Sequence, residues 1–246
     1  MTLSIVARDP ETNDMGAAVT SRFFAVGSIV PWTRSGVGAV CTQALSDPRL
    51  GVRALQALDS GVPVKLAVDG LMHGRENRRH AQLHAIALDG TTANFTGEEC
   101  IEWSGSCAGD NASVAGNMLA GPGVVEATLE GFAASTGRPL AERLLRAISS
   151  GERAGGDKRG RQSAAVVVHG GRSHAEVNLR VDDHPDPVAE LWRLYEVGHA
   201  RYLGFLAAMR DDAPDRDLLE RRVEAWTAEH GHVDFSEFWS RDPWKD

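Results

Sequence analysis

The expected helices come in consecutive pairs, and this spacing constrains the fold more than any other feature of the chain. Apolar residues recur at helical intervals in 50–61 and 63–74, and again in 121–135 and 139–151. A parallel sheet needs a crossover between successive strands, most often a helix, whereas strands joined by turns pair antiparallel. We therefore expect an α+β fold in which two antiparallel sheets carry helix pairs on their outer faces.

Strand-like segments fill the stretches between these helix pairs. Residues 2–8 alternate in side-chain direction before a turn at Asp9-Pro10, and the segment 80–97 is interrupted by Asp89-Gly90, a strong hairpin signal. The first forty-odd residues are expected to form an antiparallel meander. Further strands are expected in 36–44, 112–121, 161–171 and 174–183.

The last part of the chain differs in composition from the rest. Segments 187–210 and 216–231 are amphipathic, and the residues after them are rich in aromatic side chains. We expect a main domain of residues 1–195 and a helical extension of residues 196–246. The extension is either a simple appendage or a surface that forms a homodimer or higher homo-oligomer. Four of the six tryptophans lie near it, namely Trp192, Trp226, Trp239 and Trp244.

Charge and composition argue against several classes of function. The formal net charge of −8, from 26 basic and 34 acidic residues, disfavours nucleic acids and acidic membranes as partners. The apolar runs fall short of the ~20 residues that a membrane span needs, and the first residues lack the pattern of a signal peptide. Three cysteines without zinc-site spacing suit a reducing compartment. The expectation is a cytoplasmic protein with no metal and no cofactor.

Thr2 raises the question of an N-terminal nucleophile. Removal of Met1 would place a hydroxyl and a free α-amine on one residue. The pKa of an α-amine is about 7.7 to 8, so part of it is neutral at physiological pH and can act as general base for its own hydroxyl. Threonine also suits strands, so the residue has an ordinary structural explanation as well.

Six segments, in order, carry a resemblance to a known family. They are TLSIVARDPETND, SRFFAVGSIVPW, GVGAVCTQA, AGNMLAGPGVVEA, GGDKRGRQSAA and NLRVDDHPDPVAEL. Over roughly residues 2–195 the chain resembles a bacterial family of unknown function, domain family 1028, which belongs to the Ntn-hydrolase-like proteins, relatives of the proteasome β subunit. The resemblance implies a four-layer αββα sandwich. It also implies that the first residue of the mature chain, which Thr2 matches, is the nucleophile.

Two supporting positions differ from the proteasome pattern. Thr20 stands where proteasome subunits carry an acid in the second strand, and Arg34 is the basic residue near the place of the third-strand lysine. Arginine stays charged, so Arg34 can bind an anion of the substrate but cannot relay a proton. The general base would then be the α-amine itself.

The resemblance also draws attention to Asn117 and to the loop 155–165. Asn117 after Gly116 offers an amide to a developing oxyanion, or it forms an ordinary turn. By position, the loop resembles the one that supports the terminal threonine in proteasome-like proteins, so Asp157 and Ser163 are expected to orient the amine. Arg159, Arg161 and Gln162 are then expected substrate contacts, and the alternative is a solvated loop with local ion pairs.

Two further groups have an ordinary explanation beside a functional one. Thr42 and Gln43 are expected near the site as substrate contacts, while Cys41 beside them is more typical of an inert core thiol than of a nucleophile. The segment 182–186 contains three aspartates and His184, which suits a metal site, but an aspartate before a proline-started helix is typical of an N-cap.

These expectations give a leading function and a rival. The leading one is an N-terminal-nucleophile amidohydrolase that acts on a small amide or short peptide through Thr2. The rival is a non-catalytic Ntn-like protein for ligand binding or assembly, which the residues at Thr20 and Arg34 favour. A metal-dependent site at 182–186 is a third, weaker reading.

Overall fold

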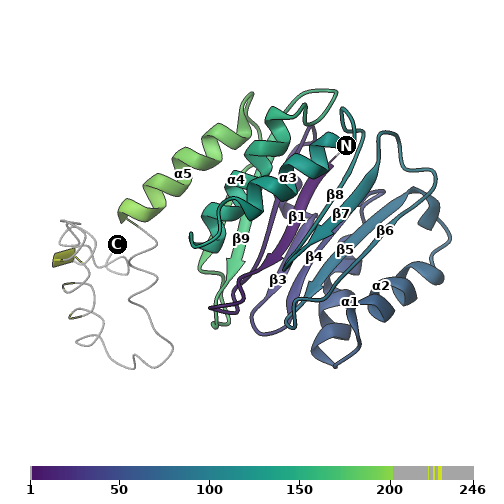
Figure 1. Ribbon diagram of the computed structural model, residues 1–246, viewed down its shortest axis with the longest axis horizontal. Coiled ribbons are helices and arrows are strands. Elements are labelled where there is room, and N and C mark those ends of the chain that lie inside the picture. The colour runs from purple at the N-terminus through teal and green to yellow at the C-terminus, as the bar shows by residue number, and fades with distance from the viewer. Residues whose placement is uncertain (1, 202–220, 222–223, 225–226, 229–246) are drawn as a thin grey trace, which may run out of the picture. The chain divides into compact units, whose positions relative to one another are not determined.

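Ten strands form two antiparallel sheets in the computed structural model, which describes residues 2–201, 221, 224 and 227–228. Figure 1 shows the sheets stacked face to face, with one pair of helices outside each of them. The expected α+β fold is confirmed, in four layers ordered helix pair, sheet, sheet, helix pair.

The first sheet has six strands in the order β10-β9-β2-β1-β8-β7, and every neighbouring pair is antiparallel. The two long central strands β1 and β2 form a hairpin around the turn at Asp9-Pro10, as expected. The strands are β1 (Thr2–Arg8), β2 (Met15–Ser21), β7 (Gly105–Gly109), β8 (Ala112–Asn117), β9 (Ser163–His169) and β10 (Val177–Val181).

The second sheet has four strands in the order β3-β4-β5-β6. The predicted hairpin at Asp89-Gly90 joins β5 to β6, where Gly90 takes a positive φ of 84°. The strands are β3 (Pro31–Arg34), β4 (Gly38–Ala44), β5 (Ala81–Ala87) and β6 (Thr92–Thr96).

The helix pairs lie where the apolar spacing placed them. Asp47 caps the first helix by accepting a hydrogen bond from the backbone N–H of Arg49, and Pro48 occupies its first turn. The helices are α1 (Pro48–Asp59), α2 (Val64–His73), α3 (Gly123–Ala133), α4 (Leu140–Arg153) and α5 (Pro187–Arg201), with short 3-10 turns at Val26–Ser28 and Arg78–His80. α1 and α2 cover the second sheet, and α3 and α4 cover the first (Figure 1).

Two sequence expectations need correction. The first four strands do not form one continuous meander, because β2 ends at Ser21 and residues 22–30 cross to the second sheet through a left-handed Ala25 and a 3-10 turn. The glycine-rich strand Gly105–Gly109 is also absent from the sequence prediction, since glycine and serine have low strand propensity.

The space between the two sheets has an apolar part and a polar part. The apolar part joins Val6, Met15 and Val19 of the first sheet to Ala39, Cys41 and Ile86 of the second. A separate apolar cluster lies between the second sheet and the helices α1 and α2. The polar part lies toward the start of β1, and it is described with the site.

The chain divides into two units, Met1–Leu194 and Tyr195–Asp246, and the division falls within α5. The predicted boundary between residues 195 and 196 stays a prediction. The expected helices beyond residue 201 and the aromatic segment 233–246 lie outside the described residues. In the described part of the chain, every helix is too short or too polar to cross a bilayer.

Packing between α4 and the first sheet yields a stability prediction. A Cβ atom on Gly151 would lie 2.2 Å from Thr128 Oγ1 and 2.5 Å from Leu3 Cδ2. We expect Gly151→Ala to lower the free energy of unfolding by about 1–3 kcal/mol, because the contact is buried and already filled. The measurement is chemical denaturation at pH 7.

Gly70→Ala is the matched control for that substitution. Gly70 lies on the exposed side of α2, and a Cβ there meets no atom within 4 Å. Alanine has the higher helix propensity, so this change should raise stability by up to about 1 kcal/mol. Equal shifts in the two variants would contradict the packing described here.

Candidate functional site

Thr2 opens β1, and its side chain lies between the two sheets with 7% of its surface exposed. It pairs with Asn117 of β8, and it lies one step beyond the Leu3–Thr20 pair, opposite Ser21 of β2. Thr2 Oγ1 lies 3.4 Å from Ser21 Oγ, a long hydrogen bond in which either hydroxyl can donate. Ser21 was missed by the sequence analysis, although the register of the predicted hairpin would have identified it.

Ser163 continues this row of polar residues but does not reach Thr2. Ser21 pairs with Ser163 of β9, so Thr2 and Ser163 are two strand spacings apart, about 10 Å at ~4.8 Å each. Ser163 Oγ donates to the carbonyl of Phe23 at 2.5 Å and accepts from the N–H of Val26 at 3.1 Å. The structure therefore gives Ser163 a role in holding the loop after β2, with Ser21 between it and Thr2.

Asn117 is held by a buried glutamine of the second sheet. Asn117 Nδ2 donates to Gln82 Oε1 at 3.1 Å, and Gln43 Nε2 donates to the same oxygen at 2.7 Å. Three acceptors share the two hydrogens of Gln82 Nε2: the carbonyls of Gly116 at 2.9 Å and Gly105 at 3.1 Å, and Thr96 Oγ1 at 2.9 Å. We call the buried network around these groups the polar layer: Ser4, Gln43, Gln82, His84, Ser113 and Asn117.

The two backbone carbonyls determine the direction of every bond in the polar layer. A carbonyl can only accept, so the amide nitrogen of Gln82 must face Gly105 and Gly116, and its oxygen must face Gln43 and Asn117. Gln43 then presents its own oxygen to Ser4, whose hydroxyl donates to it at 2.6 Å. Asn117 is therefore oriented with its nitrogen toward Gln82.

His84 completes the layer as a neutral ring. Because the Ser4 hydroxyl hydrogen is directed at Gln43, His84 Nε2 must carry a hydrogen and donate to Ser4 Oγ at 2.8 Å, while Nδ1 accepts from Ser113 Oγ at 3.2 Å. Burial lowers the pKa of His84 from 6.5 to about 3. The described buried side-chain atoms without a partner are Arg8 Nε, Arg143 Nε and His174 Nε2, and none of them belongs to the polar layer.

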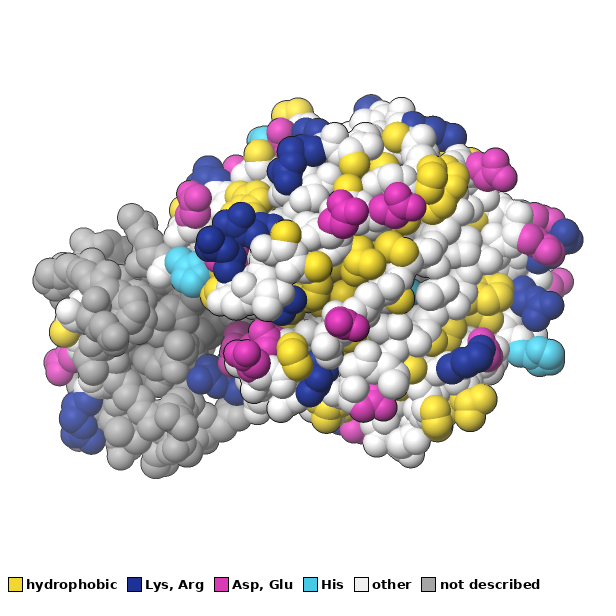
Figure 2. All heavy atoms as spheres, viewed as in Figure 1, with side chains coloured by type: hydrophobic (Ala, Val, Ile, Leu, Met, Phe, Trp, Pro, Cys, Tyr) yellow, Lys and Arg dark blue, Asp and Glu magenta, His cyan; other side chains and the backbone are white. Residues whose placement is uncertain are grey.

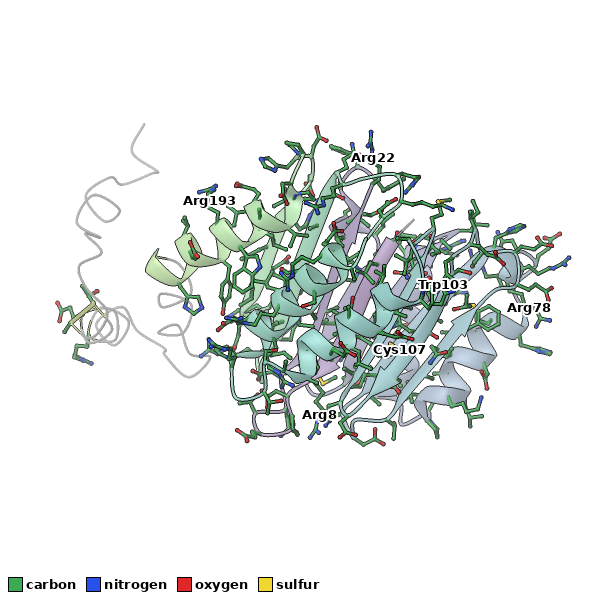
Figure 3. All side chains as sticks on the ribbon, turned by 45° about the horizontal axis from the view of Figure 1, so that its top comes forward. Arg8, Arg22, Arg78, Trp103, Cys107 and Arg193 are labelled. Atoms are coloured by element: carbon green, nitrogen blue, oxygen red, sulfur yellow. The ribbon has the colours of Figure 1, made fainter. Side chains whose placement is uncertain are left out.

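Asp157 anchors the loop 155–161 to the end of β2. Its buried carboxylate accepts from the backbone N–H of Arg22 at 2.9 Å and from that of Arg159 at 2.7 Å, and it forms an ion pair with the Arg159 guanidinium at 3.2 Å. Arg159 also donates to the carbonyl of Arg22. Figure 3 shows Arg22 and Arg8 at opposite ends of the β1–β2 hairpin, so this loop lies at the Thr2 end of the first sheet.

Arg161 binds a buried acid that the sequence analysis missed. Its Nε lies 2.6 Å from Glu152 Oε2, and Glu152 Oε1 accepts from Thr20 Oγ1 at 3.1 Å. Burial raises the pKa of Glu152, while the charge of Arg161 acts in the opposite direction. The second strand has Thr20 at the position where proteasome subunits carry an acid, and here the acid that contacts Thr20 comes from α4. The signal was an acid at position 152 on the apolar face of α4, which also carries Leu145 and Ile148.

The side chains of three expected substrate contacts are directed elsewhere. Arg34 pairs with Asp59 at 3.0 Å at the other end of β4, five residues or about 17 Å from Gln43. Thr42 faces α1 and donates to the carbonyl of Asp47, because alternate side chains of a strand point to opposite sheet faces. Gln162 is half-buried: its backbone N–H donates to the carbonyl of Ser21 at 3.1 Å, but its side chain donates to Asp183 Oδ1 at 3.1 Å. Of the pair Thr42 and Gln43, the structure brings only Gln43 into the polar layer.

The remaining candidates take structural roles in the described chain. Burial raises the pKa of Cys41 to about 12, so the thiol is inert at neutral pH. Asp186 accepts from the N–H of Ala189 at 3.2 Å, which confirms the predicted cap of α5. Within the residues that the structure describes, no cluster of three or more acidic, histidine or cysteine side chains has the arrangement of a metal site.

Left-handed backbone conformations gather at the Thr2 end of the sandwich. Ala44 follows Gln43 with φ 64°, Met118 follows Asn117 with φ 53°, and Ala25 with φ 53° lies in the loop that Ser163 holds. Residues with a Cβ are strained there by about 1–2 kcal/mol, and such strain concentrates at functional sites. The remaining described non-glycine residues with positive φ are asparagines, Asn13 and Asn111, which tolerate it.

The depressed pKa of His84 predicts a pH dependence of stability. Folded protein binds fewer protons than unfolded protein between pH 6.5 and about 3, so stability is lost as the pH falls through this range. From pH 7 to pH 5 the loss attributable to His84 should be about 2 kcal/mol. Urea denaturation of the wild type and of His84→Gln at both pH values measures it. The difference between the two proteins isolates His84 from the carboxyl groups, and identical pH slopes would contradict the buried neutral ring.

Comparisons with known proteins identify the family of this chain. A family model described as "Family of unknown function (DUF1028)" matches residues 2–191. The crystal structure of protein SPO2555 from Silicibacter pomeroyi, also a DUF1028 protein, is 33% identical, with a TM-score of 0.75 over 80% of this chain and 85% of that one. Anbu (ancestral beta-subunit) from Yersinia bercovieri is 11% identical, with a TM-score of 0.38 over 80% of this chain and 94% of that one. No curated protein matches the chain. The chain therefore belongs to the DUF1028 family.

Proposed function

We propose that this protein is an amidohydrolase of the Ntn-hydrolase type, with Thr2 as nucleophile after removal of Met1. The observation that supports the proposal most is the position of Thr2. It starts a central strand with its hydroxyl next to Ser21 and its backbone paired with that of Asn117, inside a sandwich of two antiparallel sheets.

The proposed reaction is an acyl transfer through an ester. Thr2 Oγ attacks the amide carbon while the α-amine of the same residue takes the hydroxyl proton. The amine then gives this proton to the leaving nitrogen, and water hydrolyses the ester by the same route. Ser21 is well placed to orient the Thr2 hydroxyl. Asn117 uses one N–H for Gln82, which leaves its second N–H for the oxyanion.

The proposed substrate is a small amide or short peptide, and no cofactor takes part. Arg159 and Arg161 keep 40% of their side chains exposed, so they remain the proposed anchors for a substrate carboxylate. Arg159 already contacts one acid, Asp157, and Arg161 contacts two, Glu152 and Asp186, and this weakens but does not abolish their attraction for an anion. Self-association into a homodimer or larger assembly remains part of the proposal, and light scattering tests it.

A non-catalytic binding or assembly role is the second candidate. The observation in its favour is the set of contacts at Thr2. In the described residues the polar contact of Thr2 Oγ1 is another hydroxyl, and Arg34 lies at the far end of the sheet. In this case the protein would keep the sandwich fold, and Thr2 would have no catalytic role.

The first test of catalysis combines intact mass with substitution of Thr2. We expect the purified protein to lack Met1 and to hydrolyse members of a panel of primary amides and short peptide amides. Thr2→Ala should lower kcat at least about a thousandfold because the attacking oxygen is lost, whereas Thr2→Ser should keep part of the activity. Thr136→Ala is the matched control, since Thr136 is an exposed turn residue whose hydroxyl donates to Ala133 O.

Two outcomes would contradict Thr2 as the nucleophile, and of these only ligand binding without hydrolysis would favour the second candidate. One is active protein that retains Met1 throughout, because the amine and the hydroxyl would then sit on different residues. The other is hydrolysis, or ligand binding without hydrolysis, that is unchanged in Thr2→Ala.

A further inference from the structure

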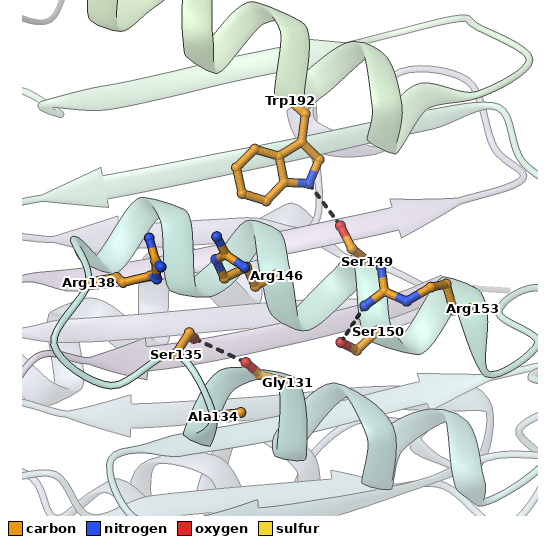
Figure 4. Close-up of a pocket in the computed structure, with 9 residues that line it drawn as sticks. All are labelled: Gly131, Ala134, Ser135, Arg138, Arg146, Ser149, Ser150, Arg153 and Trp192. Atoms are coloured by element: carbon orange, nitrogen blue, oxygen red, sulfur yellow. Dashed lines mark hydrogen bonds between the residues drawn. The ribbon is translucent and has the colours of Figure 1, made fainter.

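A pocket of about 440 Å³ lies on the helix layer that covers the first sheet. Figure 4 shows Arg138, Arg146 and Arg153 along it, Trp192 on one side, and Gly131 and Ala134 of the α3 end on the other. The volume falls within the range of small-molecule sites, roughly 300–1,000 Å³. The pocket is lined from α3, α4, the turn between them and the described part of α5, and the roles proposed for Thr2 do not use it.

The lining follows from the sequence of α4. Arg146, Ser149, Ser150 and Arg153 are spaced three, four and seven residues along the helix, so they share one face. The opposite face is buried on the sheet and carries Ile148. The polar face of α4 is thus a row of two arginines with two hydroxyls between them.

The positive charge of the pocket is only partly neutralised. Arg138 and Arg146 both bind one oxygen of Glu142, at 2.9 Å and 2.7 Å. Arg153 donates to Ser150 Oγ at 3.0 Å, and in the described part of the chain no carboxylate lies within 4.0 Å of its guanidinium. Three guanidinium groups against one carboxylate leave a local positive excess on a chain whose net charge is −8. Figure 2 shows a group of basic side chains on the face that carries α3 and α4, with acidic side chains on the same face.

The other walls suit a flat, uncharged group. Trp192 Nε1 donates to Ser149 Oγ at 2.9 Å, which holds the indole, and Arg146 Cζ lies 5.8 Å from its ring centroid. On the floor the helices approach closely, because a Cβ on Gly131 would lie 2.4 Å from Ser150 Oγ. An aromatic plane beside a group of arginines matches the two parts of an organic phosphate, since guanidinium groups bind phosphate oxygens in pairs and flat rings stack on indole.

We propose that this pocket binds a small organic phosphate carrying a planar ring. The phosphate oxygens contact Arg146 and Arg153, with Arg138 and the serine hydroxyls beside them, and the ring lies against Trp192. The site is separate from the chemistry proposed at Thr2 and does not depend on it.

Calorimetric titration of the full chain with adenosine diphosphate and with inorganic pyrophosphate tests the proposal at low ionic strength. The wild type should bind both probes, and it should bind adenosine diphosphate more tightly than pyrophosphate. Arg153→Gln and Arg146→Gln should each weaken both probes about tenfold or more, because a charge-assisted contact is lost. Trp192→Leu should weaken adenosine diphosphate several-fold and leave pyrophosphate within about twofold.

Arg193→Gln is the control for charge alone. Arg193 pairs with Glu190 on the outer side of α5, and Figure 3 shows it pointing away from the body of the molecule. The affinity of the Arg193→Gln variant for both probes should match that of the wild type. Unchanged thermal unfolding curves would show that all the variants are folded. Absence of binding at millimolar probe, or equal weakening in Arg193→Gln and Arg153→Gln, would overturn the site. Equal affinity of the two probes in wild type and Trp192→Leu would overturn the ring contact.

Discussion

The alternation of side chains along β1 is the constraint on which the rest of the site depends. Thr2 and Ser4 point into the space between the sheets, whereas Leu3 points toward α4, where it meets Gly151. Residues that pair across neighbouring strands point to the same face of the sheet, so Ser21 and Asn117 lie on the same side as Thr2. A shift of pairing by one residue would turn all of these groups toward the helices.

Helix α4 connects the two regions of chemical interest. Its buried face brings Glu152 to Thr20 and Arg161, and so ties the loop 155–161 to the first sheet. Its outer face presents the arginines of the pocket. Both faces follow from the ordinary spacing of an amphipathic helix, and the buried acid Glu152 has specific partners in Thr20 and Arg161.

Much of the fold could be predicted from the sequence because it depends on local periodicity. The helix pairs, the hairpin at Asp89-Gly90 and the cap at Asp186 all follow from spacing and turn residues within a few positions. The crossing of residues 22–30 between sheets could not be predicted in this way, since strand patterns do not say which sheet a strand joins.

The candidate site was predictable only in part, because its contacts join distant segments. Asn117 and Gln43 were identified, but Gln82 lies 35 residues from Asn117 in sequence, and nothing local marks it as a partner. The available signal was unusual: Gln82 and His84 share one face of a strand that has no solvent-exposed side. Arg34 and Thr42 were misplaced for different reasons. Arg34 lies too far along the sheet from the site, and Thr42 lies on the sheet face that points toward α1.

The orientation of Gln82 has a consequence for proton movement. A chain of hydrogen bonds conducts a proton only if every link can reverse, and the carbonyls of Gly105 and Gly116 at its end have no proton to offer. The buried imidazole therefore takes no part in proton transfer to the solvent, and the polar layer keeps its hydrogen-bond directions as long as His84 stays neutral.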